Sequence, residues 1–265
     1  MIDSTMKRKL RFSRQSYPPL ALLFWIGLWW LLATVLDTPL LLPTPLAVLK
    51  TLWRLIQTAL FWKTVLVSLA RILLGIVLAL IGGSLLALLT FKSPFFHHLF
   101  SPLLTLFKAT PVASVIFLVL LWIGRNSVPL FISFVMALPI VWSNVREGLL
   151  QTDRKLLEMA NLFSLSAKDQ LRYIRIPSLF PYFLAACRSA IALAWKAGIA
   201  AEVLCSPVHS IGRHIYEGKQ YLLTDELCAW TLVVVLISAA IEWGALKLLQ
   251  KNEKKPTGGE PHDRS

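Results

Sequence analysis

The chain has 265 residues, of which 56% are hydrophobic and only 15% charged, and its mean hydropathy is +0.65. Soluble domains carry roughly 25% charged residues, so this composition excludes an ordinary soluble protein and predicts an all-α polytopic membrane protein. The formal net charge of +13 is typical of the Lys- and Arg-rich cytoplasmic loops of such proteins, so no nucleic-acid partner is expected.

Six apolar segments predict about six transmembrane helices, since most approach the ~20 residues that cross a bilayer; they cover residues 20–36, 64–90, 99–123, 127–145, 182–205 and 226–246. The first follows the basic stretch MKRKLRFSR without an A-x-A-like cleavage site, so an uncleaved helix is expected rather than a signal peptide. Before the second, the Thr44-led stretch PTPLAVLKTLW predicts an amphipathic helix at the outer interface. Five tryptophans near segment ends predict an interfacial aromatic belt: Trp122, Trp142, Trp195, Trp230 and Trp243.

Orientation follows from the distribution of Lys and Arg. With the N-terminus in the cytoplasm, 17 of the 27 basic residues lie in cytoplasmic segments and six in outer segments. The positive-inside rule then predicts a multi-pass membrane protein with both termini cytoplasmic. The expected regions are a tail over 1–19, a first helix and outer amphipathic segment over 20–63, a core over 64–246 and a second tail over 247–265.

The longest segment predicted to be cytoplasmic, about 146–181, has the sequence pattern of two short helices joined by a tight turn. Thr152 or Asp153 can cap the first helix, whose apolar face is Leu156, Met159, Ala160 and Phe163. Ser166 followed by Asp169 predicts the cap of the second, with Arg172 and Arg175 in its last turn and Pro177 ending it before Pro181 and the next span. Such a helical pair can dock a cytoplasmic partner or lie on lipid headgroups, and physical reasoning alone leaves both open.

The segment EMANLFSLSAKDQLRYIRIP is similar to the EAA loop of ABC-transporter permeases, whose pattern is E-A-A, three residues, G, nine residues, I-x-L-P. Glu158 and Ala160 match its first and third positions, and Ile174 and Pro177 match its end. Ser164 stands where that family has Gly, which tolerates a left-handed conformation that Ser adopts at a cost of about 1 kcal/mol. Similarity continues through PTPLAVLKTLW, LLGIVLALIGGSLLALL, ATPVASVIFLVLLWIG and AWKAGIAAEVL, and it is greatest to permeases of nitrate, sulfonate, taurine, bicarbonate and thiamine-precursor importers.

The resemblance implies the permease fold of type I, MetI-like importers, a location in the bacterial plasma (inner) membrane, and a set of partners. These are cytoplasmic ABC ATPase subunits that use ATP and Mg, an extracytoplasmic solute-binding protein, and a second copy of the chain in the lipid bilayer. The implied coupling residues are Glu158, Met159, Ala160, Ser164, Leu165, Ser166, Lys168, Arg172 and Pro177. The solute is expected to be small and anionic or heterocyclic.

Charged residues inside apolar spans are candidates for a translocation path, because burying charge in lipid is costly. These candidates are Lys108, Arg188, Lys196 and Glu202. In the alternative interpretation, Arg188 extends to the interface and Lys196 pairs with Glu242 or Glu202.

No metal site or resident cofactor is expected. Adjacent His97 and His98 are interpreted as a solvated loop pair, and Cys187, Cys205 and Cys228 as small buried apolar residues. No GxxxxGK[ST] stretch is present, so the chain is not expected to be an enzyme that binds nucleotide in a P-loop. The competing hypotheses are the coupling subunit of an energy-coupling-factor vitamin transporter, whose Ala-Arg-Gly-type motifs are not found here, and an integral membrane enzyme using His97 and His98.

Overall fold

The computed structural model describes residues 17–253, and all regular elements in that part of the chain are helices. Two compact units can be separated. One contains residues 17–62 and His214–Leu232, and the other contains Lys63–Arg213 and residues 233–253. The helices are α2 (Tyr17–Leu36), α3 (Pro45–Ile56), α4 (Ala59–Lys92), α5 (Pro94–Ala109), α6 (Val112–Leu120), α7 (Val128–Leu150), α8 (Arg154–Leu162), α9 (Ala167–Gln170), the π-helical turn Leu171–Arg175, α10 (Ile176–Cys205), α11 (Ile211–Gln220) and α12 (Thr224–Glu253). The all-α prediction is confirmed.

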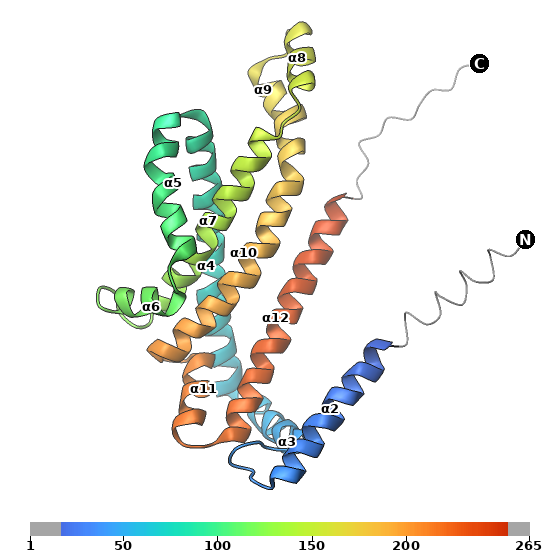
Figure 1. The fold of residues 1–265 in the computed structure, drawn as a ribbon, viewed down its shortest axis with the longest axis vertical. Coiled ribbons are helices and arrows are strands. Elements are labelled where there is room, and N and C mark those ends of the chain that lie inside the picture. Colours follow the sequence, from blue (N-terminus) through green and yellow to red (C-terminus); the bar gives the residue numbers. More distant parts are fainter. Residues whose placement is uncertain (1–16, 254–265) are drawn as a thin grey trace, which may run out of the picture. The chain divides into compact units, whose positions relative to one another are not determined.

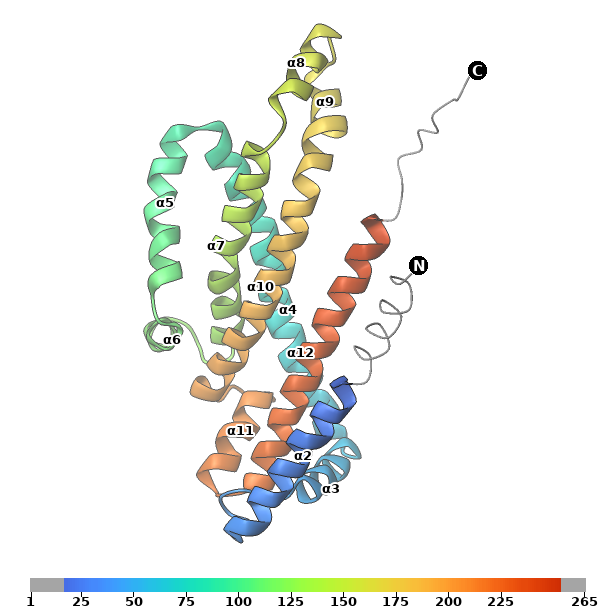
Figure 2. The same cartoon turned by 45° about the vertical axis from the view of Figure 1, so that its right-hand side comes forward.

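The core of the larger unit is built where α7 lies beside α10, an arrangement visible in both ribbon views (Figures 1 and 2). Helix α4 packs closely against α7, because a Cβ on Gly83 would come within 2.8 Å of Val141 Cβ. Gly198 of α10 likewise lies where a Cβ would meet Ser133 Oγ at 2.5 Å. Small residues permit this approach in lipid, where helices associate through close packing rather than the hydrophobic effect.

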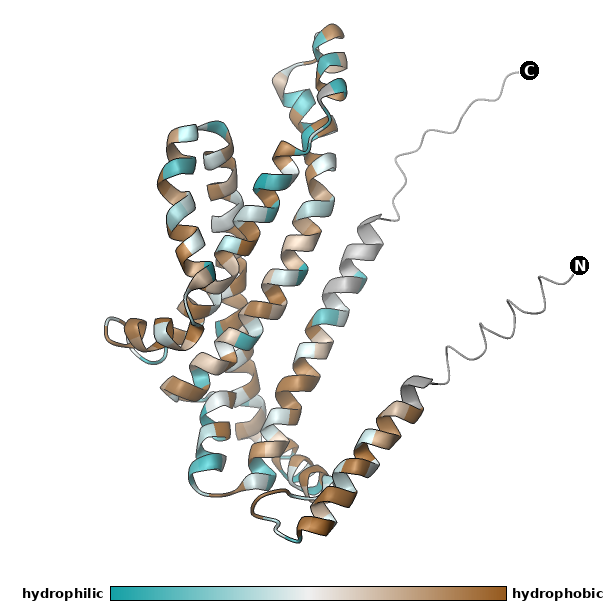
Figure 3. Ribbon diagram, viewed as in Figure 1, coloured by the Kyte–Doolittle hydropathy of each residue, from teal (hydrophilic) through white to brown (hydrophobic). Residues whose placement is uncertain are grey.

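Four helices are long and apolar enough to cross a membrane, and the bent pair α5–α6 would add a fifth; α2 contributes a shorter apolar stretch, Leu20–Leu36. The expected six spans are therefore approximately right in number and place among residues 17–253. The hydropathy colouring shows α7 and α10 as largely hydrophobic, with hydrophilic residues gathering toward α8 and α9 (Figure 3).

The third predicted span, 99–123, is wrong as a single helix. Helix α5 begins at Pro94, and it meets α6 at an angle of 106°. Thr110 has an extended conformation with ψ of 132°, because the ring of Pro111 disfavours the helical region for the preceding residue. Since α5 starts before residue 97, His97 and His98 are helical and not in a loop, and the His97 ring stacks on Trp142 with centroids 6.1 Å apart.

The predicted amphipathic helix is confirmed as α3, with Thr44 accepting a hydrogen bond from the Ala47 amide at 3.3 Å. Its neighbour in the same unit is the start of α12, where Thr51 donates to Asp225 at 2.7 Å. The side chains of Leu46, Leu49 and Trp53 point away from the unit and are 47–68% exposed. The buried face of α3 consists of Pro45, Val48, Thr51 and Leu52, so the exposed apolar side chains are free to lie at the membrane interface.

The predicted aromatic belt needs correction. Trp122 and Trp243 are well exposed as expected, but the other three tryptophans of the predicted belt are buried: Trp142, Trp195 and Trp230. Their large rings pack between the helices instead.

Helix α11 was not predicted, since it is short and contains two glycines. Cys187 and Cys205 are buried as expected, Cys228 is partly buried, and all three thiols are free.

Candidate functional site

The segment between α7 and α10 has the predicted pair of capped helical turns. Asp153 caps α8 by accepting from the Lys155 amide at 2.8 Å, whereas Thr152 donates back to Leu149 and is not the cap. Helix α8 ends in a Schellman motif, in which the Leu165 amide donates to Ala160 O at 2.9 Å and the Ser164 amide donates to Asn161 O at 3.0 Å. The motif needs a left-handed residue, and Ser164 adopts φ of 53°. The sequence comparison with Gly therefore identified a genuine conformational demand.

Ser166 restarts the chain as the N-cap of α9, as predicted. Its hydroxyl accepts from the Asp169 amide at 3.2 Å and donates to the Asp169 carboxylate at 2.6 Å. Gln170 ties the two arms together, because its side-chain amide donates to Asn161 Oδ1 at 2.9 Å and to Leu165 O at 3.2 Å. The turn is thus held by its own hydrogen bonds.

Pro177 does not end the second helix, so that prediction is wrong. Residues Ala167–Cys205 form one helical run, through the π-helical turn Leu171–Arg175 and into α10. Pro177 lies in the first turn of α10. Proline has no backbone N–H to donate, and the wider π-helical turn before it means that no regular helical hydrogen bond is required there. Arg172 and Arg175 consequently lie inside the helical run rather than at a helix end. Helix α7 continues to Leu150, so the first residues of the predicted 146–181 segment are helical.

This segment has several exposed apolar side chains and a buried residue in α8. Ala160 is 2% exposed. Four apolar side chains around it are 43–83% exposed: Leu156, Met159, Leu162 and Phe163. The charged side chains of Glu158, Lys168 and Arg172 are also exposed. We call residues 153–175 the coupling segment, after the role that the family resemblance predicts for them.

The four intramembrane candidates do not form one cluster. Lys108, Arg188 and Lys196 are exposed on α5 and α10, whereas Glu202 is fully buried. Within residues 17–253, Lys196 forms no ion pair with Glu202 or Glu242, so that pairing hypothesis is wrong in this structure. Glu202 instead pairs with Arg71, whose Nη1 lies 3.1 Å from Glu202 Oε1.

Sequence reasoning therefore missed Arg71 and its neighbour Ser68, which donates to Glu202 at 2.8 Å. The positions of Arg71 and Glu202 in the sequence could have indicated this pair. Arg71 lies near the start of one predicted span and Glu202 near the end of another that runs in the opposite direction, so both charges lie at one depth. Opposite charges at one depth in a membrane are expected to pair.

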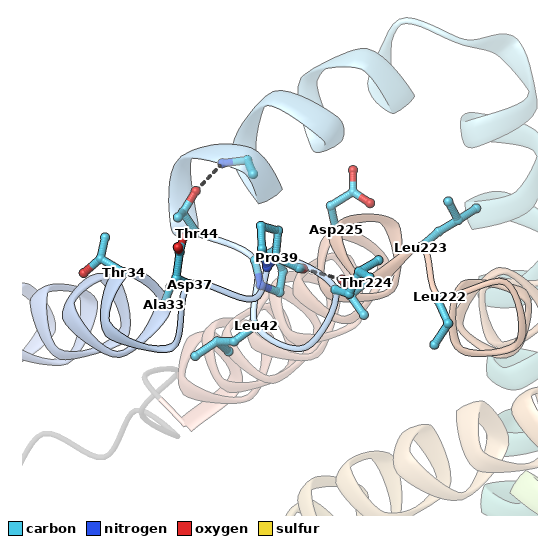
Figure 4. Close-up of a pocket in the computed structure, with 13 residues that line it drawn as sticks. Ala33, Thr34, Asp37, Pro39, Leu42, Thr44, Leu222, Leu223, Thr224 and Asp225 are labelled. Carbon is cyan, nitrogen blue, oxygen red and sulfur yellow. Dashed lines mark hydrogen bonds between the residues drawn. The ribbon is translucent and has the colours of Figure 1, made fainter.

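The smaller unit contains a cavity of about 690 Å³ between the chain after α2 and the turn before α12. Figure 4 shows Asp37, Thr34 and Thr44 on one side and Leu222, Leu223 and Asp225 on the other, with Thr224 donating to Pro39 O at 3.0 Å. No Lys or Arg is among its lining residues. The cavity therefore offers no cation to an anionic solute.

Comparison with known proteins gives a consistent picture. A family model described as the inner membrane component of binding-protein-dependent transport systems matches residues 71–243. The chain is 26% identical over 234 residues to the taurine transport system permease protein of Escherichia coli K12, covering 85% of this chain and 84% of that protein. It is 27% identical to a bicarbonate transport system permease protein of Synechocystis, covering 74% and 70%.

A nitrate import permease protein of Synechococcus elongatus is 30% identical over 141 residues, which is 53% of this chain and 50% of that protein. Among solved structures, one chain of an amino acid ABC transporter crystallised with histidines superposes with a TM-score of 0.59. It is 17% identical and covers 74% of this chain and 94% of its own length. This last likeness concerns the fold alone.

Proposed function

This chain belongs to the family of binding-protein-dependent transport system inner membrane components, and we propose from that premise that it couples solute passage to a separate ABC ATPase through the coupling segment. Membership makes the chain a multi-pass permease of an ABC importer, a transport component rather than an enzyme. It implies a solute-binding protein and ATPase partners. It does not favour an energy-coupling-factor subunit or a membrane enzyme.

The exposed apolar surface of the coupling segment carries the proposal. Leu162 and Phe163 are 83% and 76% exposed, and large apolar side chains on a self-supporting turn are typical of a helix that docks into a partner's groove. Glu158, Lys168 and Arg172 surround this surface and would supply the charged rim. Lipid headgroups are the alternative contact for the same surface.

The solute is proposed to be a small molecule carrying a sulfonate, carboxylate or other oxyanion group. Support comes from the names of the relatives, which are permease proteins for taurine, bicarbonate, aliphatic sulfonates and nitrate. We further propose that two copies of the chain form the path and that both termini are cytoplasmic. Lys108, Arg188 and Lys196 stay candidates for the path because their cationic groups are exposed on spans. ATP and Mg would be bound by the ATPase alone.

The test is co-purification. The permease is co-expressed with a candidate ABC ATPase and a candidate solute-binding protein from the same genome, and the ATPase is captured by an affinity tag. Glu158→Ala and the double variant Leu162→Ala/Phe163→Ala are each expected to lower permease recovery about tenfold, since loss of an interface anchor costs more than ~1 kcal/mol.

Glu147→Ala is the matched control, because Glu147 is an equally exposed carboxylate that lies before the coupling segment, at the end of α7. It should leave recovery unchanged. Wild-type recovery in both coupling variants would contradict the assignment and favour the lipid-headgroup contact. Uptake of labelled taurine, nitrate or bicarbonate by the reconstituted complex tests the solute class separately.

A further inference from the structure

The Glu202 carboxylate forms a buried junction between three helices. It accepts from Ser68 Oγ on α4 at 2.8 Å, from Arg71 Nη1 on α4 at 3.1 Å, and from the Gly212 amide at the start of α11 at 3.2 Å. Gly212 is needed for this approach, because a Cβ there would lie 2.4 Å from Glu202 Cβ. A carboxylate at a helix N-terminus is also favoured by the helix dipole.

The same residues hold the loop formed by residues 206–210 between α10 and α11. Arg71 Nη2 donates to Val208 O at 3.4 Å, and the Val208 amide donates to Asn126 Oδ1 at 3.0 Å. The Ile211 amide then donates to Ser68 Oγ at 2.9 Å. Asn126 belongs to the connection between α6 and α7, so the loop is held from two sides.

The loop holds two unfavourable backbone conformations. Ser206 and His209 have φ of 45° and 50°, which cost free energy in residues other than glycine and persist where the surroundings enforce them. Loss of the hydrogen bonds from Arg71 and Ser68 would therefore favour release of the loop. Cys205 directly precedes this loop and is 7% exposed in a cluster with Ile116 of α6 and Val128 of α7.

We propose that Arg71 and Glu202 are positioning residues for transport. They hold the 206–210 loop against α4 and the α6–α7 connection. As a result, the bent pair α5–α6 and α10 move together at the end of the larger unit where α10 meets this loop. The uptake measurement described below rests on the proposed importer function, whereas the labelling measurement does not.

The junction is not a solute contact. Glu202 is 0% exposed, and the Arg71 side chain is only 13% exposed with its guanidinium bonded to Glu202 and Val208. A solute would have to displace these bonds. Loss of the junction is therefore expected to lower the maximal uptake rate and to leave KM within about twofold, because it changes no group that the solute touches.

The first experiment compares Arg71→Gln, Glu202→Gln and the double variant Arg71→Gln/Glu202→Gln in proteoliposomes with the ATPase and binding protein. Each single variant leaves one unpaired charge in an apolar environment and should lower maximal uptake about tenfold. The double variant leaves no charge and should recover to within about threefold of the wild type. Arg54→Gln and Glu226→Gln, which break an exposed ion pair of 3.0 Å, are the controls and should have no effect.

The second experiment uses Cys205 as a reporter in the Cys187→Ala/Cys228→Ala background, with purified permease in nanodiscs. Maleimide labelling of Cys205 should be about tenfold faster with Glu202→Gln, as expected when a local opening becomes more populated, and unchanged with Glu226→Gln. This measurement needs no transport.

Unchanged labelling of Cys205 in Glu202→Gln would overturn the proposal, as would a raised KM at unchanged maximal rate, which would make the junction a solute site. Failure of the double variant to recover although it reaches the membrane in normal amounts would also overturn the role of charge pairing. If the wild-type complex transports no solute, the proposed function fails while the labelling result still decides this inference.

Discussion

Ser164 is a residue whose identity opposes its backbone conformation. It ends α8 at φ of 53°, where a serine is disfavoured by about 1 kcal/mol relative to glycine because its Cβ approaches the carbonyl oxygen. The two hydrogen bonds of the Schellman motif and the bridging Gln170 hold it there. The coupling segment thus retains the backbone of a glycine turn while carrying a side chain.

We expect Ser164→Gly to stabilise this turn by about 1 kcal/mol and Ser164→Val to destabilise it by at least as much, because a β-branched side chain is stiffer and more crowded in the left-handed region. Hydrogen exchange of the Leu165 amide, which is bonded to Ala160, measures the local opening. Exchange should slow about fivefold in the glycine variant and accelerate in the valine variant. Equal exchange in all three proteins would show that the turn is held entirely by its surroundings.

At the scale of elements, the packing of α4 against α7 requires a glycine at one position of α4 but not at the position before it. A Cβ on Gly83 would lie 2.8 Å from Val141 Cβ and 3.1 Å from Leu138 O, whereas a Cβ on Gly82 would meet Leu138 Cδ1 at an ordinary 3.5 Å. Adding a methyl to the tight position forces the helices apart. The two glycines form a natural matched pair.

Gly83→Ala is expected to destabilise the permease by about 1–3 kcal/mol through overpacking. Gly82→Ala should be neutral or slightly stabilising, since Ala favours a helix over Gly by about 1 kcal/mol. Thermal unfolding in nanodiscs, followed by a fluorescence assay, compares the two variants directly. Equal losses in both would contradict the close α4–α7 packing.

The break between α5 and α6 is an element-scale feature that hydropathy does not report. Residues 99–123 are mostly apolar, with Lys108 as the one charged residue, and a mostly apolar run of this length predicts one span. Pro111 favours the break, but the direction of α6 depends on packing: Ile116 and Val119 are buried against α7 and α10. Only the tertiary contacts select the 106° bend.

At the scale of the whole molecule, the charge distribution makes a testable prediction of the orientation of the chain in the membrane. The coupling segment and the connection between α11 and α12 are separated by one span along the chain, α10, so they belong on opposite sides of the membrane. The excess of Lys and Arg predicts that the coupling segment is cytoplasmic. The two connections offer well exposed positions at Leu162 and Tyr221, 83% and 65% exposed.

Single cysteines at these positions test the orientation in a background lacking the three native cysteines. A membrane-impermeant maleimide should label Leu162→Cys only in inside-out vesicles and Tyr221→Cys only in intact cells. The positive-inside rule predicts nearly complete selectivity in each case. The reverse pattern would place both termini outside, and labelling of both from one side would show that the span count between them is wrong.

The sequence by itself determined the class of the protein and most of its elements. Apolar length sets the spans, and capping chemistry located Ser166 and limited the first cap to Thr152 or Asp153, because these features depend on neighbouring residues alone. The left-handed turn at Ser164 was indicated by the resemblance to a family that has Gly at this position. Tertiary structure decided the pairing of Arg71 with Glu202, the burial of Trp142, Trp195 and Trp230, and the passage of the helix through Pro177. Each of these depends on which helix lies beside which, a property of packing that spacing along one chain does not encode.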